Sequence, residues 1–142
     1  MKRQGIIKVL SLMFVLTFLI SLSHAEEKKI KLKPGMETKK AEGEVMIKDE
    51  MGQKKIVIHT EYLRPNSVYT VWLVNEKPKM DMMGLGMGNY SFKTDDKGTG
   101  HYEASISADD LGKWQIMKIA FHPDGDVKNM KGIKIDLEGM LK

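Results

Sequence analysis

The chain has 142 residues, of which 30% are charged, and its formal net charge is +4. It contains no cysteine, which excludes a disulfide framework, a cysteine nucleophile, a thiol redox centre and a zinc–thiolate site. The length is that of a single domain.

The first 25 residues are predicted to be a cleavable signal peptide. A basic start, an apolar run at residues 9–20 and small residues up to Ala25 form the three-part pattern of such signals. The run is shorter than the roughly 20 residues that cross a bilayer, so we expect no stable membrane insertion after cleavage. Residues 26–142 keep 20 basic and 19 acidic side chains, a net charge of +1. We therefore predict a periplasmic or secreted protein without a nucleic-acid partner.

The N-terminal third of residues 26–142 shows strand signals after a lysine-rich start. Residues 26–39 end in Pro34-Gly35, and we expect them to form at most a short edge strand and a partly mobile arm. Apolar residues that alternate with polar ones from Ala41 onward, a turn at 49–52 and a return strand at 55–63 centred on Ile56, Val57 and Ile58 predict a hairpin.

The rest of the chain also predicts strands. Residues 68–74 are β-branched or aromatic on both faces, which is typical of a central strand, and we expect Trp72 and Trp114 in the core. Residues 75–88 hold one proline, three glycines and four methionines, and we interpret them as a long loop. Further predicted segments are strands near 90–92, 102–106, 114–121 and 133–137, a helical turn capped by Ser107, and a tight turn at 122–126.

No 3.6-residue period persists along the chain, whereas turns recur every 8–12 residues or so. Seven or eight short strands with this spacing predict a single all-β domain at residues 26–142, folded as an antiparallel sandwich or a barrel.

Two sequence patterns resemble a known family. The pattern L-x-P-x-x-x-Y-x-V-W-L at residues 63–73 and F-K-T-D-x-x-G at 92–98 resemble the extracytoplasmic domain of anti-sigma-K-type factors. The resemblance covers residues 45–106, about half of residues 26–142, and implies an immunoglobulin-like β sandwich. No part of the sequence matches the sigma-binding segment of that family, so the resemblance bears on the fold and not on the function.

The segment that most strongly suggests a ligand site is M-D-M-M-G-L-G-M at residues 80–87, which has four thioethers in eight residues. Soft sulfur ligands favour Cu(I), and the glycines would allow the loop to close around an ion, with a histidine adding an imidazole. The predicted copper(I) ligands are Met80, Met82, Met83, Met87, His101 and His122.

Other roles fit the same methionines. They would fill the open end of the sandwich as adaptable core side chains, or form an adaptable surface for a partner. We predict foremost a non-catalytic binding module of the cell envelope that contacts an unidentified envelope protein through residues 77–90. The alternatives are a periplasmic Cu(I) carrier or sensor and a structural subunit of an envelope complex.

The histidine spacing and the search for enzyme motifs give no further evidence for a metal site or an active site. No two histidines stand at a metal-ligand spacing in the sequence; we expect His101 and His122 at the surface, and His59 bonded to a neighbouring hydroxyl. Neither G-x-S-x-G nor H-E-x-x-H occurs, and no nucleophile with its base can be assigned. We therefore predict that the protein is not an enzyme.

Overall fold

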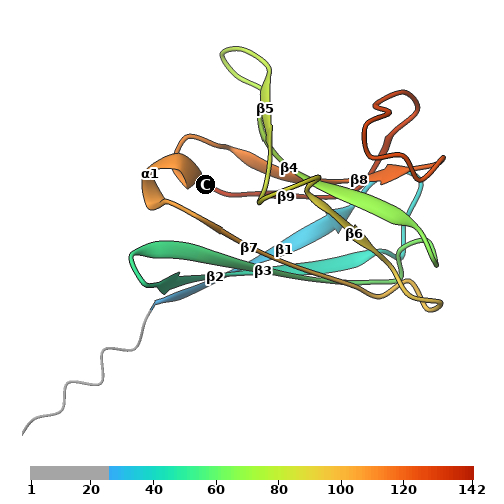
Figure 1. The fold of residues 1–142 in the computed structure, drawn as a ribbon, viewed down its shortest axis with the longest axis horizontal. Helices are drawn as coiled ribbons and strands as arrows, with labels where there is room; N and C mark the ends of the chain where they lie inside the picture. Colours follow the sequence, from blue (N-terminus) through green and yellow to red (C-terminus); the bar gives the residue numbers. More distant parts are fainter. Residues whose placement is uncertain (1–25) are drawn as a thin grey trace, which may run out of the picture.

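The computed structural model describes residues 26–142, so the predicted signal peptide lies outside the described residues. These residues form strands joined by short turns, with one helical turn (Figure 1). The elements are β1 (Glu27–Pro34), β2 (Glu42–Glu50), β3 (Gln53–Glu61), β4 (Val68–Asn75), β5 (Asp81–Gly84), β6 (Ser91–Lys93), β7 (Gly100–Ile106), α1 (Ala108–Leu111), β8 (Ile116–His122) and β9 (Lys134–Met140). Within residues 26–142 no helix is long and apolar enough to span a membrane.

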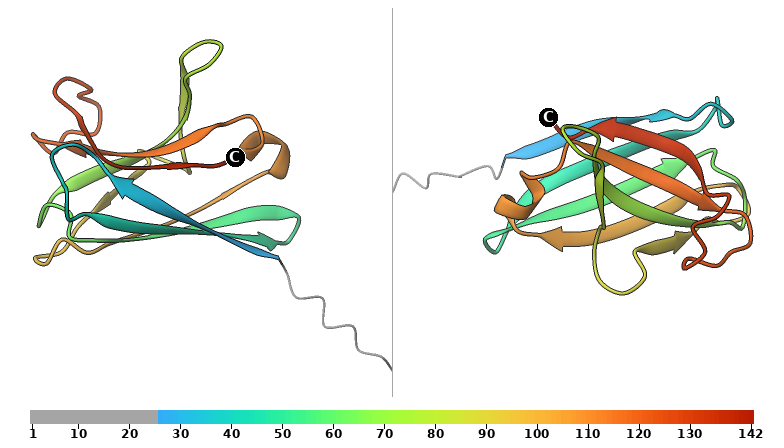
Figure 2. Two further views of the ribbon diagram at one scale, coloured as in Figure 1. Left: turned by 180° about the vertical axis from the view of Figure 1, so that it is seen from behind. Right: turned by 90° about the horizontal axis from the view of Figure 1, so that it is seen from above.

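Two layers of antiparallel strands pack face to face (Figure 2). Sheet A has the order β1–β2–β3–β7, and sheet B has the order β5–β4–β8–β9, with β6 also paired to β4. The pairs β3–β7 and β4–β8 each join strands that are distant in sequence, as do the B–E and C–F pairs of immunoglobulin domains. The predicted all-β antiparallel sandwich is therefore confirmed.

Residues 27–34 form an edge strand, as expected, but this strand is eight residues long and passes from one sheet to the other. The first part of β1 pairs with β2, whereas Lys33 and Pro34 pair with β9, so β1 lies between the two sheets and joins them. In Figure 2 this strand, coloured blue, crosses from one layer to the other. Each part of β1 pairs on one side only, and its lysine-rich sequence is typical of an edge strand.

The core lies between the sheets and follows the two-residue period of the strands. Ile56 and Ile58 of β3 face Tyr69, Val71 and Leu73 of β4, and all are fully buried. Trp114 also belongs to the core, as predicted. Trp72 does not: its neighbours Val71 and Leu73 point inward, so its side chain points to the outer face of sheet B, where it is half-buried.

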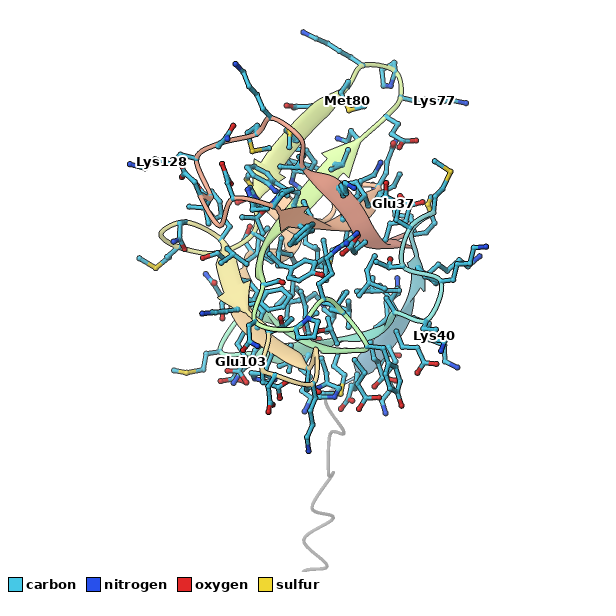
Figure 3. All side chains as sticks on the ribbon, turned by 90° about the vertical axis from the view of Figure 1, so that its right-hand side faces the viewer. Glu37, Lys40, Lys77, Met80, Glu103 and Lys128 are labelled. Atoms are coloured by element: carbon cyan, nitrogen blue, oxygen red, sulfur yellow. The ribbon has the colours of Figure 1, made fainter. Side chains whose placement is uncertain are left out.

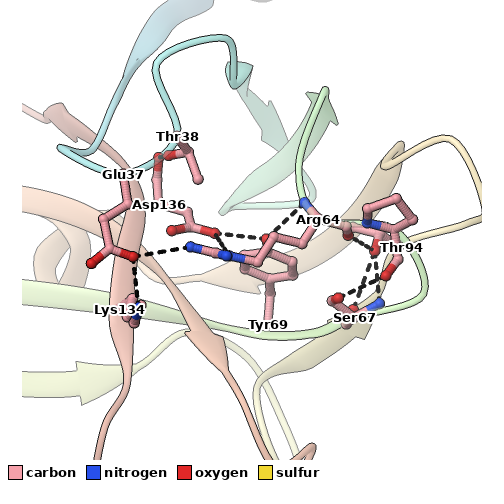
Figure 4. A network of polar contacts seen from close by, with 9 residues as sticks. Glu37, Thr38, Arg64, Ser67, Tyr69, Thr94, Lys134 and Asp136 are labelled. Atoms are coloured by element: carbon pink, nitrogen blue, oxygen red, sulfur yellow. Dashed lines mark hydrogen bonds and ion pairs between the residues drawn. The ribbon is translucent and has the colours of Figure 1, made fainter.

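A β-bulge in β9 carries a buried carboxylate into one end of the sandwich (Figure 4). Ile119 pairs with Leu137 and Ala120 with Ile135, so Asp136 is the extra residue. Its Oδ2 accepts hydrogen bonds from Tyr69 Oη at 2.8 Å and from Arg64 Nε at 3.2 Å. Bulges of this kind redirect a side chain, and here the result is an ion pair between the buried Asp136 and the partly exposed Arg64.

A second carboxylate, that of Glu37, extends this network to the surface. Glu37 accepts hydrogen bonds from Lys134 at 2.7 Å and Arg64 at 3.3 Å, and the Lys134 contact lowers the pKa of Glu37. Burial raises the pKa of Tyr69 far above its usual value, so its phenol stays protonated and acts as a donor. The network therefore ties the loop after β1 and the loop before β4 to β9.

Candidate functional site

Residues 75–90, here called the methionine hairpin, project from the edge of sheet B. The interpretation of residues 75–88 as a loop without strands is wrong, because β5 pairs with β4. Leu73 stands opposite Met83 and Val74 opposite Met82. Figure 1 shows the turn between β4 and β5 rising away from both layers, and Figure 3 places Lys77 and Met80 in this projecting part.

The hairpin is anchored by one leucine. The side chain of Leu85 is fully buried in the core, and its backbone N–H donates to the carbonyl of Val71 at 2.9 Å. The hydroxyl of Tyr102, which lies in sheet A, donates to the Leu85 carbonyl. The loop after β5 is thereby bonded to both sheets, which gives the hairpin a fixed base.

The rings of Tyr90 and Trp72 cover the outer side of β5 at Gly84. The ring of Tyr90 covers Gly84 so closely that a Cβ atom at Gly84 would lie 2.0 Å from it. The same ring packs edge-on against Trp72, with the ring centroids 5.8 Å apart. Glycine at position 84 is thus required by the approach of Tyr90.

The methionines of the hairpin are exposed and do not fill the core. The exposed fractions are 63% for Met80, 45% for Met82, 37% for Met83 and 96% for Met87. Leu85, which lies among them in the sequence, takes the buried position instead. The alternative that these methionines plug the open end of the sandwich is therefore wrong.

The four thioethers do not share one face. Successive side chains of a strand point to opposite sides, so Met82 lies with Val74 on the outer face of sheet B, and Met83 points to the inner side with Leu73. While β5 stays paired to β4, these two sulfur atoms cannot ligate one ion together. Met87 lies beyond the buried Leu85, in the loop that follows β5.

The two predicted histidine ligands lie away from the hairpin. His101 is in β7 on the outer face of sheet A, where its Nε2 bonds to Glu103 at 3.2 Å. His122 pairs with Val68, six residues along β4 from Val74, which separates it from Met82 by about 20 Å along the strand. The structure therefore brings neither histidine to the methionines.

His122 is buried, so its predicted exposure is wrong. Trp72 Nε1 donates to Thr70 Oγ1 at 2.7 Å, and Thr70 Oγ1 lies 2.7 Å from His122 Nε2. His122 Nδ1 lies 3.0 Å from the carbonyl of Asp126, which can only accept, so Nδ1 carries the proton and Nε2 accepts from Thr70. This series of hydrogen bonds holds Trp72 and the turn after β8 on the outer face of sheet B.

The register adds residues to this face that sequence reasoning missed. One cross-strand row runs over four strands and consists of Met82, Val74, Ile116 and Met140. In the next row Lys118 stands beside Trp72 and pairs with Glu76 at 2.9 Å and Glu138 at 3.7 Å. Both faces of β4 are apolar in sequence, so no local signal shows which residues point outward.

No family model, curated protein or solved structure matches the chain. The resemblance to anti-sigma-K-type factors therefore stays a prediction. Among residues 26–142, no three histidine, aspartate or glutamate side chains already converge on one point as metal ligands would.

Proposed function

We propose that this protein is an exported, non-catalytic binding module of the cell envelope that contacts a protein partner through the methionine hairpin and the adjoining outer face of sheet B. One observation carries the proposal. A hairpin fixed at its base by the buried Leu85 keeps four methionines exposed, from 37% for Met83 to 96% for Met87.

Exposed methionine suits this role for a physical reason. The side chain is unbranched, flexible and polarizable, so it adapts to apolar partner surfaces of different shape. Methionine and aromatic residues are also enriched in protein interfaces, and the Trp72–Tyr90 pair lies directly beside Met82 and Gly84. Together these residues give an apolar surface on an ordered scaffold, which limits the entropy lost on binding.

Site-specific photo-crosslinking in the native host tests the proposal. A photoreactive phenylalanine analogue replaces Met82 in one variant and Met51 in a control, since Met51 is 97% exposed at the β2–β3 turn. We expect a covalent adduct of one discrete mass at position 82 and none at position 51. Equal adducts at both positions, or none at position 82, would contradict the proposed contact surface.

Export itself is tested by the mass of the intact exported protein. Cleavage of the predicted signal peptide should leave Glu26 as the first residue.

A Cu(I) carrier or sensor is the second candidate, supported by four solvent-accessible thioethers in one hairpin. Because Met82 and Met83 face opposite sides of β5, binding by all four methionines requires β5 to detach from β4. An anaerobic Cu(I) titration against a chromophoric competitor, beside a variant with all four changed to leucine, tests this. Stoichiometric binding that the variant loses, with faster amide exchange in β5, supports it; equal binding in both proteins excludes it.

A further inference from the structure

Two histidines that are 42 positions apart in the sequence stand directly opposite each other in sheet A. The β3–β7 register pairs His59 with His101. Both alternate with inward-facing residues, so both imidazoles lie on the outer face of the sheet, with side-chain exposures of 52% and 59%. His59 was expected to bond to a neighbouring hydroxyl, and this is wrong: its Nε2 lies 3.4 Å from Glu61 Oε1.

Carboxylates surround this histidine pair. Glu44 of β2 stands opposite His59 on the other side of β3, and Glu61 and Glu103 each lie two residues along the strand from a histidine. Glu103 also pairs with Lys55 at 3.8 Å. Surface hollows adjoin the pair on both sides, one reaching from His59 over Glu44 and one reaching from His59 and His101 toward Asp95.

The present hydrogen bonds favour metal binding at the imidazoles. An ionised carboxylate can only accept, so Nε2 of each ring carries a proton and Nδ1 of each neutral ring carries the lone pair. A carboxylate that accepts from one ring nitrogen raises the basicity of the other, which is the usual arrangement behind a metal-bound histidine. Imidazole and carboxylate together suit Zn²⁺, Ni²⁺ and Cu²⁺.

We propose that His59 and His101 form a chelate site for a divalent transition-metal ion on the outer face of sheet A, in which the two Nδ1 atoms bind the ion and Glu44 and water complete the site. Glu61 and Glu103 keep their hydrogen bonds to the Nε2 atoms. Residues directly opposite in an antiparallel pair have Cβ atoms about 5 Å apart, which lets two imidazoles reach one ion. Both histidines and their glutamate partners are exposed, so the two Nδ1 atoms converge by rotation of these side chains. Such rotations take place in picoseconds to nanoseconds.

The site exists only in the folded chain. In the unfolded state the two histidines are separated by a flexible segment, whereas the β3–β7 pairing fixes them side by side. An ion that binds only the folded state raises the free energy of unfolding in proportion to the logarithm of its concentration. Chelation by the pair therefore predicts stabilisation by metal that depends on both histidines.

The direct test is a titration of residues 26–142 with Zn²⁺ by calorimetry and with Cu²⁺ by electron paramagnetic resonance. The variants are His59→Gln and His101→Gln, with Glu138→Gln as the control, because Glu138 is an exposed glutamate of sheet B. We expect one ion per chain, tighter binding of Cu²⁺ than of Zn²⁺, and two imidazole nitrogens on Cu²⁺. Each histidine variant should lose at least about tenfold in affinity and show one nitrogen, while the control binds as the parent does.

Unfolding provides an independent readout. Zn²⁺ should raise the urea midpoint of the parent and the Glu138→Gln control, and raise the midpoints of both histidine variants by less at the same Zn²⁺ concentration. Unaltered binding in both histidine variants would overturn the site, as would binding lost only in the four-methionine variant. Glu103 and Met80 lie on opposite sides of the sandwich in Figure 3, so crosslinking at position 82 is expected to be the same with or without the ion.

Discussion

The anchoring of the methionine hairpin by Leu85 makes a sharp prediction about stability. We expect Leu85→Ala to destabilise the whole domain, and Met87→Ala, two residues away, to leave its stability almost unchanged. The two side chains differ in burial: Leu85 is fully buried within the core, whereas Met87 is 96% exposed.

The magnitude follows from that difference. Full burial of a leucine side chain is worth about 1.5–3 kcal/mol, and the cavity left by truncation brings the cost of Leu→Ala to about 2–5 kcal/mol. The site lies between two sheets and its backbone is bonded to both, so it cannot collapse freely. We therefore expect a loss of about 3 kcal/mol for Leu85→Ala and a change within about 0.5 kcal/mol for Met87→Ala.

Urea denaturation followed by tryptophan fluorescence measures both variants. With a slope near 2 kcal/mol per molar urea, the Leu85→Ala midpoint should fall by about 1.5 M. An unchanged slope would show that the protein still unfolds as one unit. A loss below about 1 kcal/mol for Leu85→Ala, or equal losses in the two variants, would refute the view that Leu85 is the anchor and the methionines are presented to solvent.

Three further predictions concern the elements around the candidate site. Thr70→Val should cost about 1–3 kcal/mol in a denaturant titration, because it leaves the buried Nε2 of His122 without its partner, and it should leave the fold unchanged by circular dichroism. Gly84→Ala should cost about 1–3 kcal/mol and alter tryptophan fluorescence, because the new Cβ displaces the ring of Tyr90; a silent substitution would refute this packing. Burial raises the pKa of Tyr69, so its contribution to stability is complete below pH 10 and falls as the pH rises above that value. Absorbance titration at alkaline pH should show this phenol ionising only as the protein unfolds, and normal ionisation in the native state would contradict it.

The sequence by itself determines most of the strands, because the two-residue period is a local property. The alternation in β2 predicts that Val45 and Ile47 share one face, and both are buried in the core. Turn chemistry and capping are local as well: Ser107 was predicted to cap a helical turn, and its hydroxyl accepts from the N–H of Asp110. Several short strands without a helical period were enough to predict an all-β sandwich or barrel.

Other features depend on which strands pair with one another, and no local sequence pattern shows that pairing. Both faces of β4 are apolar, so only the packing of sheet B against sheet A decides that Val71 points inward and Trp72 outward. Leucine and methionine are both hydrophobic, so hydrophobicity alone does not show which residue of the segment 80–87 is buried. Leu85 is buried because β5 pairs with β4 in one register and brings that residue over the core.

The histidine pair shows most clearly the difference between features that are local in the sequence and features that depend on strand pairing. Spacing along the chain gives no metal-ligand pattern, because His59 and His101 are 42 positions apart. The β3–β7 register places them opposite each other, and a shift of one residue would turn one of them to the other face. Local propensity therefore determined which segments are strands. Long-range pairing, set by packing of the whole domain, decided which side chains meet on its two outer faces.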